Sequence, residues 1–181
     1  VMHEGLKWEW ESFKEYLDAL EKRDRDIDIC TLLPHAALRV YVMGERAIKH
    51  ERANKEDLKK MRLITKEAIL AGAFGFSTSR TISHKSLKGE YTPTLRAHED
   101  ELTEIALGMK DAGAGFMEIV SDWNEPDPET EFNVLKRISK KSGRPIVFSL
   151  TQRHDRPDFW KDLMKMSLDC LLYTSDAADD C

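Results

Sequence analysis

The chain has 181 residues, of which 41% are hydrophobic and 34% charged, and this content suffices for one domain with a core. Its formal net charge of −5 argues against nucleic acid or an anionic membrane as a partner, and the absence of any run of 18 apolar residues argues against a transmembrane helix. Three cysteines without the spacing of a disulfide framework favour a reducing compartment, so we expect a cytoplasmic protein.

The first half of the chain predicts helices on both sides of one strand. Residues 10–23 repeat apolar side chains at helical spacing, and residues 27–33 are typical of a strand that Pro34 closes. A short helix is predicted over residues 35–43. Asn54 is a favourable N-cap for a longer helix that ends at Gly72.

The second half predicts three further strands, each followed by a helix. The strand after Gly72 is short and apolar enough, with Ala73, Phe74 and Phe76, to be buried on both faces. Residues 115–121 and 145–150 predict the other two strands. A helix is predicted over residues 99–112, ended by Gly113, and another over residues 129–142, ended by Gly143. A last helix is predicted from Phe159 through Met164.

Strand–helix alternation of this kind implies parallel strands joined by crossover helices. The loops that leave the strands are long and polar, whereas the joins from helix to strand are short, which is the layout of (β/α)₈ barrels. A doubly wound sheet is the alternative, but no Gly-x-Gly-x-x-Gly or P-loop motif follows a strand. We therefore predict an α/β fold, a partial (β/α)₈ TIM-type barrel of four consecutive strand–helix units, with exposed sheet edges and poor stability on its own.

Polar side chains gather directly after the second predicted strand, where parallel α/β folds place their chemistry. Ser79, Arg80, His84 and Lys85 supply hydroxyl, guanidinium, imidazole and ammonium groups that suit a small substrate with a carboxylate and an amide carbonyl. For His84 and Lys85 the alternative is a solvated loop.

Three further candidates follow strands. Arg39 is expected either to bind a substrate carboxylate or to pair with Glu45 or Asp28. His35 is placed for metal binding, although a structural histidine that holds a loop is the alternative. Asp122 is a weaker candidate metal ligand at the end of the third strand.

Four separated motifs resemble the N-acyl-D-amino-acid deacylases of the amidohydrolase superfamily: Trp8-Glu-Trp-Glu-Ser-Phe-x-x-Tyr-Leu-x-Ala-Leu, Pro34-His-Ala-Ala-Leu-Arg, Val42-Met-Gly-Glu-Arg, and Ala68-Ile-Leu-Ala-Gly-Ala-Phe-Gly-Phe-Ser-Thr. The resemblance extends from about residue 8 to residue 170. It implies a barrel that hydrolyses the amide of an N-acyl-D-amino acid or a related amide, using zinc or a similar divalent metal. It also implies a chain of several hundred residues, of which this piece is roughly the central third.

The resemblance is incomplete at the metal site. The family places histidine ligands after the strands that correspond to residues 116–121 and 146–152, and neither segment contains a histidine. His154 is a weak candidate for a displaced ligand. We therefore expect the metal to be bound only in the full-length parent. There the missing N- and C-terminal parts of the same barrel pack against this fragment and supply ligands, and the fragment alone holds no metal. The alternative is a divergent barrel that lost the metal ligands and does other chemistry or only binds ligand, with the truncated fragment inactive.

The last residues differ in character from the rest. Residues 170–181 resemble the translation of a transposon-end sequencing adapter, so we expect residues 1–169 to be the barrel fragment and residues 170–181 an artefactual tail. The alternative is a native acidic tail.

Overall fold

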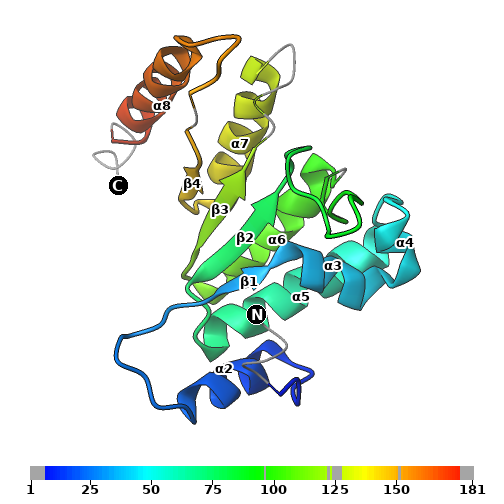
Figure 1. Cartoon of the computed structure of the whole chain (residues 1–181). Coiled ribbons are helices and arrows are strands. Elements are labelled where there is room, and N and C mark those ends of the chain that lie inside the picture. The colour runs from blue at the N-terminus through cyan, green and yellow to red at the C-terminus, as the bar shows by residue number, and fades with distance from the viewer. Residues whose placement is uncertain (1–6, 96, 122, 124–127, 151, 176–181) are drawn as a thin grey trace.

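Helices and strands alternate along the chain (Figure 1). The computed structural model describes residues 7–95, 97–121, 123, 128–150 and 152–175. The elements are α2 (Phe13–Glu21), β1 (Leu32–Pro34), α3 (His35–Met43), α4 (Glu45–Ile48), α5 (Lys55–Ala71), β2 (Gly75–Ser79), α6 (Glu99–Ala112), β3 (Phe116–Val120), α7 (Pro128–Ser142), β4 (Ile146–Phe148) and α8 (Phe159–Ser175).

The four strands form one parallel sheet in the order β1-β2-β3-β4. Each crossover therefore steps in the same direction, and right-handed crossovers that all step the same way place their helices on one face of the sheet. A doubly wound sheet instead reverses direction at a switch point. The order confirms the prediction of consecutive barrel-type units.

The core lies between the sheet and this helical layer. Side chains of β2 and β3, such as Phe76 and Met117, are fully buried together with Met61 of α5 and Leu102 of α6. A second cluster joins β3 to α7 and α8 through Ile119, Phe132, Leu135, Phe159 and Leu163, with Trp123. Burial of these side chains is the main source of stability for the sheet and its helices.

The other side of the sheet is open. Side chains alternate along a strand, so the residues between the buried ones point away from the helices. Pro34, Ser77, Glu118 and Val147 lie in one row across the four strands, and we call this side the open face. Glu118 is exposed and Val147 is 54% exposed.

Several predicted helix boundaries are confirmed. Helix α3 has the predicted bounds, and α5 begins after Asn54, whose side chain accepts hydrogen bonds from the backbone N–H groups of Glu56 and Asp57. Helix α5 ends at Gly72, which has a left-handed backbone with φ of 118° that other residues rarely adopt. Among the described helices, none combines the length and apolar character needed to cross a bilayer.

The first predicted strand is largely wrong. Only residues 32–34 form β1, while Ile27 and Ile29 are 74% and 51% exposed. The reason is the neighbouring strand: β2 begins at Gly75, opposite Leu32, so residues 27–30 have no β2 residues opposite them. Phe74, predicted to be buried, is likewise 57% exposed because it precedes β2.

Helix α8 continues past residue 170 to Ser175, so its end is not at the predicted junction. The artefactual origin of residues 170–181 stays a prediction.

Candidate functional site

Ser79 and His84 meet at the carboxyl end of β2. Ser79 is the last residue of the strand, and its Oγ lies 2.7 Å from His84 Nδ1. His84 belongs to the long connection from β2 to α6, residues 80–98, and is exposed. Since Ser79 lies on the side of β2 away from buried Thr78, the pair stands at the edge of the open face.

Lys85 follows His84 in the sequence, but its ammonium group contacts Tyr91 and not the Ser79–His84 pair. Its Nζ lies 4.8 Å from the ring centre of Tyr91, and the two residues form an isolated antiparallel bridge. An ammonium above an aromatic ring gains a modest attraction. Lys85 therefore adds positive charge beside the pair and is not hydrogen-bonded to it in the interactions that the structure describes.

The backbone around Ser79 is held from two sides. The hydroxyl of Thr94, a buried residue, donates to the carbonyl oxygen of Ser79 at 2.6 Å. The backbone N–H of Arg80 donates to the carbonyl of Val120 on β3 at 2.9 Å. These bonds fix the strand end while the Ser79 hydroxyl remains at the open side.

The guanidinium of Arg80 contacts other residues of the fold and is mostly shielded from solvent. Its Nη1 donates to the carbonyl of Ala97 at 2.6 Å, and its Nε lies 3.0 Å from Oε1 of Glu131 on α7. The Nε–H is not aimed at that oxygen well enough for a hydrogen bond, so the contact is an ion pair without one. With the Arg80 side chain only 20% exposed, its charge is largely offset by Glu131.

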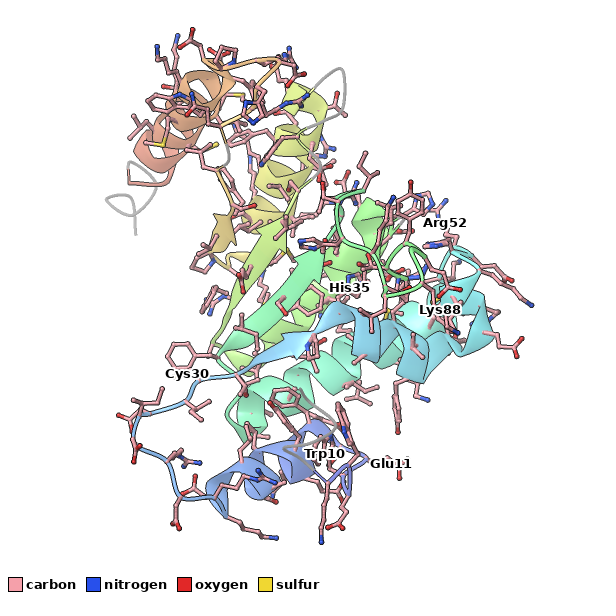
Figure 2. All side chains as sticks on the ribbon, in the orientation of Figure 1. Trp10, Glu11, Cys30, His35, Arg52 and Lys88 are labelled. Atoms are coloured by element: carbon pink, nitrogen blue, oxygen red, sulfur yellow. The ribbon has the colours of Figure 1, made fainter. Side chains whose placement is uncertain are left out.

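A fully buried polar network lies beside the same strand end. His35, the first residue of α3, places Nδ1 2.7 Å from the Thr78 hydroxyl and Nε2 2.8 Å from Oε1 of Glu101 on α6. The Nε of Arg39 donates to the same Glu101 oxygen at 3.0 Å. The side chains of His35 and Arg39 have no solvent exposure, and Figure 2 places His35 inside the fold.

The network fixes the proton positions on His35. Burial lowers the pKa of the imidazole below its ordinary value, against a smaller opposite effect of Glu101, so the ring is neutral. A carboxylate can only accept, so Nε2–H donates to Glu101 and Nδ1 accepts the proton of the Thr78 hydroxyl.

These contacts do not fit two of the predicted roles. Both ring nitrogens of His35 are engaged, which leaves none for a metal. Arg39 also donates to the carbonyl oxygens of Pro93, at 3.4 Å, and Glu51, and its buried guanidinium is closed to a substrate carboxylate. Its carboxylate partner is Glu101 and not Glu45 or Asp28.

The structure gives no support to the remaining candidate metal ligands. His154 is exposed in the loop before α8, and Asp122 lies outside the described residues. Within the part of the chain that the structure describes, no three His, Cys, Asp or Glu side chains are grouped closely enough to hold a metal ion. These residues alone therefore do not fit a metal centre, and we derive no chemical step through one.

Residues 1–175 match the model of the Amidohydrolase family. The chain belongs to this family. The amidohydrolase chain is 26% identical over 159 residues to a D-aminoacylase of Alcaligenes xylosoxydans xylosoxydans, covering 88% of this chain and 30% of the relative. It is 32% identical over 102 residues to an N-acyl-D-aspartate deacylase of the same organism, covering 55% of this chain and 18% of the relative. The chain thus spans less than a third of the length of either relative.

Solved structures support the fold. The amidohydrolase chain superposes on a D-aminoacylase structure concerned with a binuclear metal centre, with a TM-score of 0.64 and 22% identity over 78% of this chain and 27% of the other. A D-aminoacylase variant in complex with CuCl₂ gives the same values. The four strand–helix units are therefore similar to part of an amidohydrolase barrel.

Sequence reasoning missed the partners that hold the site. Glu101, Thr94 and Glu131 were not predicted, although all three are buried. The signal for Glu101 was its place on α6: it lies four residues before Ile105, on the stripe that faces the core. A carboxylate there needs a buried cationic or hydrogen-bonding partner.

Proposed function

We propose that this chain is part of a hydrolase that cleaves the C–N bond of an amide, with an N-acyl-D-amino acid or a related amide as substrate. The family match over residues 1–175 carries this proposal. Similarity to a D-aminoacylase and to an N-acyl-D-aspartate deacylase supports the substrate class.

The proposed enzyme uses a divalent metal, zinc or a similar ion, in the longer protein. The binuclear metal centre of the related D-aminoacylase supports this part of the proposal. The described residues do not group as ligands, so the proposal places the ligands mainly in other parts of the barrel. The isolated 181-residue chain is accordingly expected to be inactive.

The proposed contribution of this chain is substrate binding at the carboxyl end of β2. The Ser79 hydroxyl and the His84 imidazole, 2.7 Å apart, can hydrogen-bond the amide or carboxylate of an acylated amino acid, and Lys85 adds positive charge. Arg80 is assigned to the wall of the site, because its guanidinium is held by Ala97 and Glu131.

The test measures turnover and metal content of the complete polypeptide that carries this segment. Purified protein is assayed with N-acetyl-D-leucine and N-acetyl-D-aspartate, with the L-enantiomers as controls, and its metal content is measured by plasma mass spectrometry. We expect hydrolysis of a D-substrate and at least one bound divalent ion per chain. Metal-free protein with full activity would contradict the metal requirement, and inactivity with metal bound would contradict the substrate class.

Ligand binding without metal-dependent hydrolysis is a second candidate. Two observations favour it: the described ends of β3 and β4 carry no histidine, and both nitrogens of His35 are engaged. In that case the complete protein would bind an N-acyl amino acid, detected by calorimetry, without metal and without turnover.

A further inference from the structure

We infer that the buried chain Arg39–Glu101–His35–Thr78 is a positioning device that sets where the Ser79 hydroxyl stands. Its functional meaning rests on the binding role proposed for Ser79 and His84, but the positioning itself does not. The four residues of this relay are buried, on the side of the sheet away from the open face, and are positioning residues, not catalytic ones.

The relay joins three parts of the fold that are distant in sequence. His35 and Arg39 lie on α3, Thr78 on β2 and Glu101 on α6, with sequence separations of 43 between His35 and Thr78 and 66 between His35 and Glu101. The relay therefore ties the strand end to the helix that follows β1 and to the helix that follows β2 itself.

The hydrogen bonds among Thr78, His35 and Glu101 all donate in one direction, from Thr78 through His35 to Glu101. The neutral ring donates through Nε2–H to Glu101 and accepts through Nδ1, so the proton of the Thr78 hydroxyl must point inward to the ring. Arg39 places its positive charge 3.0 Å from the Glu101 carboxylate inside the protein. Every donor and acceptor in these hydrogen bonds has a partner, and reversing the direction of one bond would leave another donor or acceptor without one.

The end of the relay is next to the candidate site. Thr78 precedes Ser79, and side chains on successive strand residues point to opposite faces. Fixing the Thr78 side chain on the helical side therefore orients the Ser79 side chain on the other. Together with the bonds from Thr94 to Ser79 and from Arg80 to Val120, this leaves the Ser79 hydroxyl aimed at His84. A functional group held by such second contacts is preorganised.

The first measurement uses the intact 181-residue chain and NMR of its histidine ring nitrogens. We expect His35 to show a protonated Nε2 and an unprotonated Nδ1 at about pH 7 to 8, above the ordinary pKa of imidazole. A protonated Nδ1 on His35, or a doubly protonated ring, overturns the relay without any substitution.

The second measurement uses Thr78→Val, which removes the hydroxyl at similar side-chain size, and Thr78→Ser, which keeps it. We expect Thr78→Val to shift the Ser79 amide and His84 ring signals and to lose the scalar coupling or exchange protection that reports the Ser79–His84 hydrogen bond. Thr78→Ser should restore all of these. The amide of Val147 on β4 serves as an internal reference and should not move with either substitution.

Unchanged Ser79 and His84 signals in folded Thr78→Val would overturn the positioning role. Should Thr78→Val not fold, the ring-nitrogen measurement on the unsubstituted chain still decides the relay, and Thr78→Ser must then leave the Ser79 and His84 signals unmoved. None of these readouts involves turnover, so a failure of the proposed hydrolase activity is distinguishable from a failure of the relay.

Discussion

Glu101 is the residue that the buried network depends on, because it is the only carboxylate among the four members of the relay. It accepts from both His35 and Arg39 with 1% exposure of its side chain. Removing it would leave a guanidinium inside the protein without its counter-charge. Breaking one partner of a buried ion pair is costly for this reason, typically about 3–5 kcal/mol.

We therefore expect Glu101→Ala to lower the free energy of unfolding by about 3–5 kcal/mol, measured by urea denaturation followed by circular dichroism. Glu104→Ala on the same helix is the matched control, because Glu104 pairs with Arg62 at a site where both side chains are about a third exposed. Its cost should be about 0–1 kcal/mol. Equal effects of the two substitutions would contradict the importance of the buried network.

His35 makes stability depend on pH in a defined direction. Burial lowers the pKa of its imidazole below the ordinary 6.5, so on acidification the unfolded chain takes up this proton before the folded one does. Stability from His35 is complete above pH 6.5 and falls as the pH decreases below it, by roughly 1 kcal/mol for each pH unit until the folded pKa is reached.

The measurement compares urea denaturation of the unsubstituted chain and of His35→Gln between pH 5 and 8. The substituted chain lacks this titration, so its free energy of unfolding should fall less steeply below pH 6.5. Parallel curves for the two proteins would contradict a depressed pKa of His35.

At this scale the sequence predicts the candidate residues Ser79 and His84 but not the residues that hold them. The prediction is possible because polar residues directly after a buried strand are a local pattern; the binding role itself stays a prediction. The Glu101 contact to His35 spans 66 residues, and nothing local identifies which histidine a buried carboxylate will meet. For Arg39 the sequence offered a substrate carboxylate or a pair with Glu45 or Asp28, which are near it along the chain, whereas its partner Glu101 is 62 residues away.

At the scale of elements, α5 and α6 approach each other closely at Gly108. A methyl group at that position would lie 2.5 Å from the backbone oxygen of Arg62 and 3.0 Å from the Cβ of Thr65. Glycine within a helix normally costs about 1 kcal/mol relative to alanine. Here it permits contact between two helices of the layer that covers the sheet.

Gly108→Ala is therefore expected to lower the free energy of unfolding by about 1–3 kcal/mol, although alanine is the better helix former. Thermal and urea denaturation measure the change. Glu67→Ala, at an exposed position on α5, tests helix propensity without the contact and should be close to neutral. Stabilisation by Gly108→Ala would mean that the two helices are not in this close contact.

The elements themselves were largely predictable, since their boundaries are local chemistry. The N-cap Asn54 and the left-handed Gly72 bound α5 where the sequence placed its ends. β1 was not predictable to the same degree, because a strand extends only as far as its neighbour: residues 27–31 alternate like a strand, but β2 begins opposite Leu32. Strand length is thus a property of the pair.

At the scale of the molecule, the sheet has helices on one face and exposes the other. Val147 on the edge strand β4 is 54% exposed, and Glu118 beside it is also exposed. Unprotected strand edges and apolar side chains on a bare sheet favour association between chains. The isolated chain is therefore expected to self-associate through this face.

Sedimentation at several protein concentrations tests this prediction. The average mass of the unsubstituted chain should rise with concentration, and Val147→Lys should reduce the rise because it places a charge on the edge. Leu70→Lys, which alters a 65% exposed position on α5, should leave the rise unchanged. A monomer at all concentrations would contradict self-association through the open face.

The strand order β1-β2-β3-β4 has a consequence for synthesis of the protein. Each described strand after β1 pairs with the strand translated just before it, so β2, β3 and β4 can each dock on a strand that is already made, without waiting for a later segment. Contacts made in this order keep the loops that must close short, which favours rapid folding. During synthesis the next unit always adds to the unpaired edge of the strand made last. If translation pauses, that edge is the one that chaperones would have to cover.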